Sequence, residues 1–140
     1  MKHHPIPYFT FEGTAREALA YYEEVFEGEI TDLQTFGEAD FETPPEMDNY
    51  IMHARFKKDE LFFMVSDTFL NQNVTVGNNI SLALELDSAE EIESLYVHLK
   101  EKGTVYMELQ DTFWGATIAK VKDAYGVIWD LNFEKSGSSK

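Results

Sequence analysis

The chain has 140 residues, of which 44% are hydrophobic and 14% aromatic, and its 26 acidic and 11 basic residues give a formal net charge of -15. This composition predicts a globular protein with a sizeable core, and the negative charge disfavours partners with phosphate backbones or anionic membrane surfaces. The absence of cysteine excludes disulfides, thiolate metal ligands and cysteine nucleophiles.

No apolar run approaches the roughly 20 residues that a membrane-spanning helix needs. The first residues lead directly into a strand-like segment and lack the apolar core of a signal peptide. We therefore expect a cytoplasmic protein that binds neither a membrane nor nucleic acid.

The first half of the chain predicts one helix and four strands. Thr14 and Glu17 have the spacing of a capping box at the start of an amphipathic helix, and Gly28 ends that helix. Residues 37–49 form an acidic loop with two prolines, which is either a lid or a solvated connection. Alternating apolar residues and β-branched or aromatic side chains predict strands over residues 6–12, 29–36, 50–56 and 61–66.

The second half repeats this order. Ser88 and Glu91 again have capping-box spacing, and Gly103 follows the helix. In the strand before this helix, the alternation from Ile80 to Leu86 predicts one buried face. Strands are predicted over residues 80–86, 104–109, 118–121 and 127–133, with a tight turn at residues 123–126 joining the last two.

The shared order of strand, helix and three strands indicates an internal duplication. We predict an α+β fold with two βαβββ modules that form one structural domain. The first module spans residues 1–68, a connection spans 69–79, the second module spans 80–135, and residues 136–140 are a flexible tail.

Three stretches carry a resemblance to a known family: Tyr8 to Gly13 with the helix after it, Phe113-Trp114-Gly115, and Asp123 to Trp129. Over these stretches the chain resembles the vicinal oxygen chelate superfamily, which includes glyoxalase I, extradiol dioxygenases and bleomycin-resistance proteins. It looks most like the PhnB-like branch. The resemblance implies a glyoxalase-like fold in which two βαβββ modules form a half-open β cup, with the ligand in the cup and a homodimer as the common assembly.

Enzymes of this superfamily hold a divalent metal with His or Glu side chains from the first and fourth strands of each module. The matching positions in this chain are Pro7, Met64, Ser81 and Asp130, of which only Asp130 keeps a carboxylate. We therefore predict no metal and no other cofactor. The alternative is a divalent-metal-dependent isomerase, lyase or dioxygenase with an unusual ligand set that includes Asp130 and Glu85.

The same mapping predicts a ligand pocket. Its expected lining is largely apolar and aromatic, although filling the core is an equally good interpretation of Phe11 and Phe62. The predicted lining residues are Phe9, Phe11, Phe62, Met64, Ser81, Trp114 and Tyr125.

Asp130 and Glu85 are the candidate catalytic residues, since a carboxylate pair in the cup would supply a general base. The alternative for each is a structural carboxylate that accepts hydrogen bonds from a neighbouring strand or loop. Asp67 and Asp111 are interpreted as turn caps. The four histidines are interpreted as surface, partly buried or terminal residues rather than ligands: His3, His4, His53 and His98.

The sequence thus predicts a PhnB-like protein that binds a small, largely apolar or cationic ligand without a metal. Whether it is an enzyme stays open at this stage. A purely structural dimerisation module is a further alternative.

Overall fold

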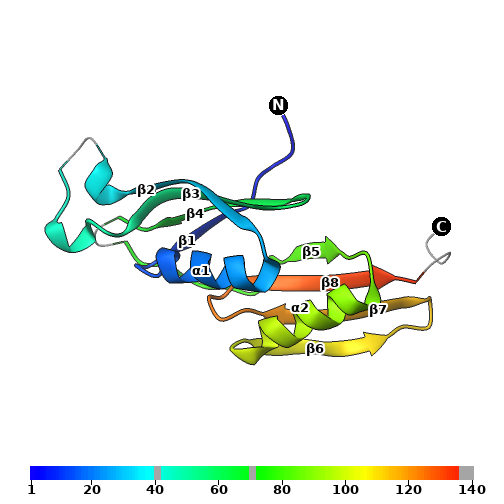
Figure 1. Cartoon of the computed structure of the whole chain (residues 1–140). Helices are drawn as coiled ribbons and strands as arrows, with labels where there is room; N and C mark the ends of the chain where they lie inside the picture. The colour runs from blue at the N-terminus through cyan, green and yellow to red at the C-terminus, as the bar shows by residue number, and fades with distance from the viewer. Residues whose placement is uncertain (40–41, 70–71, 136–140) are drawn as a thin grey trace. The chain divides into compact units, whose positions relative to one another are not determined.

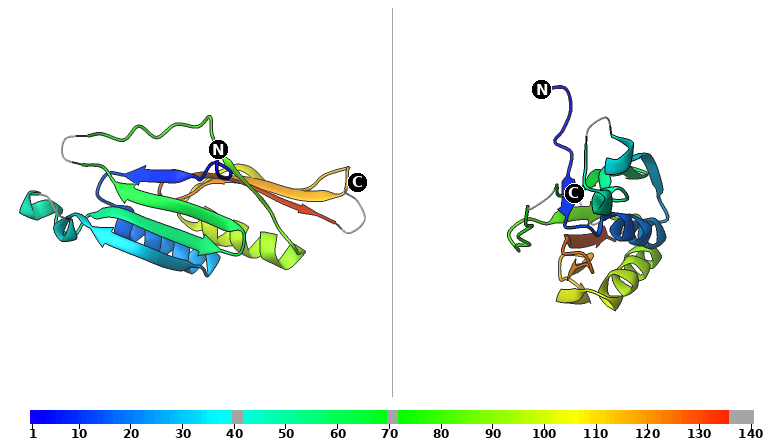
Figure 2. Two further views of the ribbon diagram at one scale, coloured as in Figure 1. Left: turned by 90° about the horizontal axis from the view of Figure 1, so that it is seen from above. Right: turned by 90° about the vertical axis from the view of Figure 1, so that its left-hand side faces the viewer.

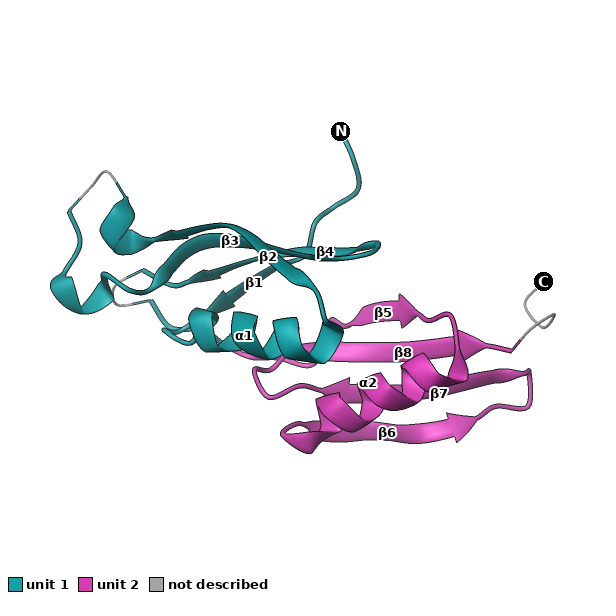
Figure 3. Ribbon diagram, viewed as in Figure 1, with its two compact units in different colours: residues 1–75 teal, residues 76–140 magenta. Residues whose placement is uncertain are grey.

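The computed structural model describes residues 1–39, 42–69 and 72–135 (Figure 1). The chain divides into two compact units, residues 1–75 and 76–140 (Figure 3). The division lies inside the predicted connection, and the predicted tail at 136–140 lies outside the described residues. That both modules form one structural domain stays a prediction.

Among the described residues, each unit contains one α-helix and four strands in the predicted order, which confirms the α+β fold. Two short 3-10 helices, η1 and η2, lie between β2 and β3. The elements of the first unit are β1 (Tyr8–Phe11), α1 (Ala15–Phe26), β2 (Glu29–Thr35), η1 (Phe36–Glu38), η2 (Pro45–Met47), β3 (Ile51–Lys58) and β4 (Leu61–Asp67). Those of the second are β5 (Leu82–Glu85), α2 (Ala89–Glu101), β6 (Thr104–Asp111), β7 (Ala116–Lys122) and β8 (Ile128–Glu134).

The two sheets have matching topology. Sheet 1 has the order β1-β4-β3-β2 and sheet 2 the order β5-β8-β7-β6. In each, the first strand pairs in parallel with the last, and the remaining neighbours are antiparallel. Both sheets are open rather than closed barrels, which agrees with the glyoxalase-like fold.

In each unit the helix lies on one face of its sheet (Figures 1 and 2). Helix α1 packs on β3 and β4, and α2 packs on β6, β7 and β8. In sheet 1 the core on the helix side is aromatic: Tyr22 and Phe56 are fully buried, and Phe56 stacks on Phe63 with 4.8 Å between ring centroids. We call the other side of each sheet its open face.

The first predicted capping box is wrong. The Thr14 side chain makes no capping hydrogen bond, and the backbone N–H of Ala15 instead donates to the Asp67 carboxylate at 2.9 Å. At the second helix the Ser88 hydroxyl accepts from the backbone N–H of Glu91 at 3.0 Å, as predicted. A distant residue therefore replaces the local cap only in the first unit.

The structure also bears on the predicted strand before α2 and on the acidic loop. Ile80 is 74% exposed and lies before β5, so the predicted buried face of this strand does not include it. Phe36, just before the acidic loop, and Met47 within it are buried, and the N–H of Gly37 donates to the Asp48 carbonyl at 3.0 Å. These anchors favour the interpretation as a connection, although residues 40 and 41 lie outside the described residues.

Candidate functional site

The open face of sheet 1 combines apolar and basic side chains in one row across three strands. Met64 on β4 lies opposite Tyr8 on β1 and opposite Arg55 on β3. Phe62, two residues before Met64, projects from the same side of β4. Beside this row, the Tyr8 hydroxyl and Nδ1 of His53 lie at hydrogen-bond distance, 3.2 Å.

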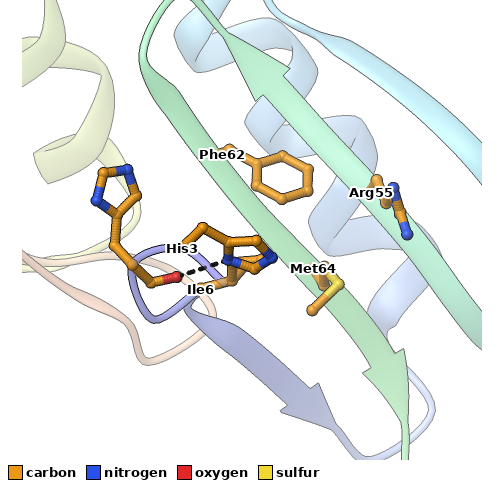
Figure 4. A pocket seen from close by; sticks show the side chains of 6 residues that line it. His3, Ile6, Arg55, Phe62 and Met64 are labelled. Atoms are coloured by element: carbon orange, nitrogen blue, oxygen red, sulfur yellow. Dashed lines mark hydrogen bonds between the residues drawn. The ribbon is translucent and has the colours of Figure 1, made fainter. Parts of the chain in front are cut away.

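A cavity of about 320 Å³ lies on this open face. Phe62 and Met64 contribute its apolar side, while residues before β1 cross in front of them (Figure 4). Backbone pairing holds that segment in place, since the Met64 N–H donates to the Pro7 carbonyl at 3.0 Å. The described lining residues are His3, His4, Ile6, Arg55, Phe62 and Met64.

The structure separates residues that were expected to share one face. Phe9 lies on the helix side, where its ring is 4.6 Å from that of Phe63 and 6.2 Å from that of Tyr22. Phe11, two residues further along the same strand, is buried, with 6% of its surface exposed. The expectation that these two rings face the same way as Phe62 and Met64 is therefore wrong, because Phe62 and Phe63 point to opposite sides of β4.

On sheet 2, Ser81 and Asp130 are brought together as the mapping implied. The Ser81 hydroxyl donates to Asp130 Oδ2 at 2.5 Å, and Lys120 Nζ lies 4.0 Å from the same oxygen. Glu85 lies opposite Asn132 rather than opposite Asp130, and the two candidate carboxylates are therefore diagonal neighbours. Asp130 thus already has a hydroxyl and an ammonium partner.

The aromatic loop between β6 and β7 is exposed. Phe113 is 96% exposed and Trp114 56% exposed, and their rings meet edge to face with 5.0 Å between centroids. At the end of β6, the hydroxyl of Thr117 and then Lys135 hold the pKa of Asp111 below its ordinary value. This carboxylate links β6 to Thr117 on β7 and to Lys135 through its side chain. Its interpretation as a turn cap stays a prediction.

Tyr125 lies in the turn between β7 and β8, half-buried. Its backbone N–H donates to Oδ1 of Asp123 at 2.8 Å, while the Trp129 indole donates to Oδ2 of the same carboxylate at 2.8 Å. Asp123 is itself buried, with 4% of its surface exposed. The turn is thus built around this carboxylate, and the backbone N–H of Tyr125 is one of the groups that bind it.

The residues present do not fit the divalent metal of the superfamily's enzymes. In unit 1 the mapped positions offer a proline, whose carbonyl is used in strand pairing, and the soft thioether of Met64. In unit 2 they offer a hydroxyl and a carboxylate that bond to each other. Among the described residues, no group of three or more His, Asp or Glu side chains is placed to hold a metal ion.

Sequence reasoning missed the residues before β1 as part of the cavity. His3 and His4 were interpreted as a terminus, yet both line it, with Ile6 and Arg55. A local signal existed for Arg55 alone. Its chain neighbours Ala54 and Phe56 are buried, and strand alternation therefore puts Arg55 on the other face of β3. The position of the N-terminal segment depends on long-range pairing that no local pattern specifies.

Within residues 1–39, 42–69 and 72–135, neither the length nor the apolarity of any helix is sufficient for crossing a membrane.

The chain is similar to known proteins over most of its length. A sequence profile of the family described as 3-demethylubiquinone-9 3-methyltransferase matches residues 3–132. The chain is 27% identical to Protein YjdN of Escherichia coli (strain K12) over 139 residues, which cover 92% of this chain and 94% of that protein.

Two solved structures are also similar. Protein PA1353 from Pseudomonas aeruginosa has a TM-score of 0.84 and 32% identity, with 95% of this chain and 98% of that chain covered. A putative 3-demethylubiquinone-9 3-methyltransferase, PhnB protein, from Bacillus cereus has a TM-score of 0.78 and 26% identity, with 94% and 99% covered.

Proposed function

Since the chain belongs to the family described as 3-demethylubiquinone-9 3-methyltransferase, we propose that it binds a small, largely apolar molecule on the open face of sheet 1. This family lies within the PhnB-like branch of the vicinal oxygen chelate superfamily. The observation that carries this proposal is the cavity of about 320 Å³ beside Phe62 and Met64. Cavities that bind small molecules start at roughly 300 Å³ and are lined mainly by apolar side chains with a few polar groups.

The lining favours an apolar ligand over the predicted cationic alternative. Phe62, Met64 and Ile6 supply apolar surface, and the lining residues within the described part of the chain include no carboxylate. A cation there would be repelled by Arg55, and none of these lining residues carries a negative charge to compensate for that repulsion. Participation of Ser81, Trp114 and Tyr125 in ligand binding stays a prediction, as does the homodimer.

We do not propose the methyl transfer that the family's description names. Nucleotide-bearing cofactors are commonly held at a glycine-rich turn after the first strand of a parallel sheet. In this chain the first strand is followed by a single glycine, Gly13, whose added Cβ would meet the Tyr50 hydroxyl at 3.0 Å. That glycine makes room for a side chain of the protein itself.

A neutral fluorescent probe, phenyl-naphthylamine, tests the proposal. We expect saturable binding to the full chain, weakened about tenfold or more by Phe62→Ser because the substitution removes apolar contact area from the cavity. Phe113→Ser is the matched control, since this ring is 96% exposed and does not line the cavity. Circular dichroism of both variants checks that the fold is retained.

The wild-type chain failing to bind the probe would overturn the proposal. Equal weakening by both serine variants would do so too, because it would place the probe away from the cavity.

A further inference from the structure

Arg55 gives the cavity on sheet 1 a fixed positive charge, and we infer that this residue recognises an anionic group on the ligand. The inference rests on the proposed function and narrows its ligand class. The ligand is then a molecule with an apolar body and one group of negatively charged oxygens, such as a carboxylate or sulfonate. The body contacts Phe62 and Met64, and the charged oxygens bind the guanidinium.

The position of Arg55 suits this role. It lies opposite Met64 in the sheet, and its side chain lines the cavity next to the apolar side chains of β4 (Figure 4). An arginine presents five N–H donors in a planar fork that matches two oxygens of a carboxylate at once. Apolar contact and anion recognition are therefore available within one small cavity.

The ion pair that Arg55 makes within the protein is weak. Its Nε lies 3.7 Å from Oδ2 of Asp32, which is longer than a hydrogen bond, and the two side chains are 48% and 66% exposed. Exposed ion pairs of this kind contribute little to stability, so a ligand anion can compete with Asp32.

The charge of the cavity opposes that of the chain. The described lining residues include Arg55 and two histidines but no acid, although acidic residues outnumber basic ones 26 to 11 in the whole sequence. Lys57 follows on the same side of β3, opposite Phe62. A local positive field in an acidic protein attracts anions to that place.

On sheet 2 the corresponding basic residue has a carboxylate partner on the neighbouring strand. Lys120 on β7 occupies the place that Arg55 has on β3, since each lies between two buried residues and opposite the last strand of its sheet. The residue opposite Lys120 is Asp130, whose carboxylate lies 4.0 Å away, whereas the residue opposite Arg55 is the neutral Met64. Only the arginine therefore lacks a neutralising residue on the last strand.

Two probes with the same aromatic body separate the charge from the apolar contact. Anilinonaphthalene sulfonate carries an anionic group, and phenyl-naphthylamine has none. At about pH 8 and low salt, where exposed charges are least screened, we expect Arg55→Gln to weaken sulfonate binding about tenfold. The same variant should leave the neutral probe within about twofold, and Arg55→Lys should restore part of the sulfonate affinity.

Lys57→Gln is the matched control, because it removes one positive charge from the same face of the same strand without removing a lining residue. We expect it to change sulfonate binding by about twofold or less. Equal effects of the two glutamine variants, or equal weakening of both probes by Arg55→Gln, would overturn the inference while leaving the proposed function intact. Failure of the wild-type chain to bind the neutral probe would instead overturn the proposed function.

Discussion

Asp67 joins two distant segments of the first unit through one buried carboxylate. Its Oδ1 accepts the backbone N–H of Ala15 at the start of α1, and its Oδ2 accepts that of Ile51 at the start of β3, each at 2.9 Å. Only 4% of its surface is exposed. A carboxylate at a helix N-terminus also interacts favourably with the helix dipole.

We expect Asp67→Ala to lower the free energy of unfolding by about 2–4 kcal/mol, because two buried backbone donors lose their acceptor. Asp67→Asn should cost less, since its amide oxygen still accepts one of the two N–H groups. Urea unfolding followed by circular dichroism measures both. Glu24→Gln, an exposed charge change on α1, is the control, and an equal loss in the control would contradict this role.

The sequence indicated that Asp67 caps a turn but could not identify its partners. Thr14 and Glu17 have the correct local spacing for a cap, and local spacing was the only available signal. The donor–acceptor pair that forms instead links residues on α1 and at the end of β4. Such a pair depends on the completed sheet, so sequence spacing alone does not contain it.

At the scale of elements, the hairpin of β7 and β8 is organised by Asp123. The carboxylate accepts from the backbone N–H groups of Tyr125 and Val127 and from the indole of Trp129. Trp129 is fully buried. One side chain thereby fixes both the turn and the largest ring in the core of the second unit.

Replacing the indole by Trp129→Phe should destabilise the protein by about 1–3 kcal/mol, since Oδ2 of Asp123 loses a buried donor and the smaller ring leaves space. Asp123→Asn should also destabilise, because the NH2 group that replaces one carboxylate oxygen would face either the indole N–H or the backbone N–H groups of Tyr125 and Val127. A double-mutant cycle by urea unfolding should give a coupling of about 1 kcal/mol. Strictly additive effects would contradict a direct bond between the two side chains.

Strands and helices were largely predictable because their periodicity is local. Residues 29–36 and 61–66, for example, were predicted within one residue of β2 and β4. It was harder to predict on which face of sheet 1 the side chains of Phe9 and Phe62 lie. These faces depend on the register in which β1 pairs with β4, and a shift of one residue reverses the face that every side chain occupies. The cavity needed this register and the path of residues 3–6, neither of which is encoded locally.

At the scale of the whole molecule, the tryptophans offer a test of whether the two units unfold together. Trp114 and Trp129 both belong to the second unit, while helices and strands occur in both. Tryptophan fluorescence therefore reports on one unit, and far-ultraviolet circular dichroism reports on both.

From the prediction of one structural domain, we expect the two signals to give the same urea midpoint. Asp67→Ala, which changes only the first unit, should then shift the fluorescence midpoint as well. A fluorescence midpoint unaffected by this variant would show two independently unfolding units and contradict the prediction. The Glu24→Gln variant again serves as the control.

The pairing of the first strand of each unit with its last has a consequence for synthesis on the ribosome. β1 emerges early, but its partner β4 is the final strand of the unit, and the same holds for β5 and β8. Parallel pairing of such distant segments requires closing a long loop of chain. A nascent chain that ends before β4 therefore holds the segment of residues 3–6 without the strand that positions it, and the cavity can form only after the last residues of the unit have left the exit tunnel.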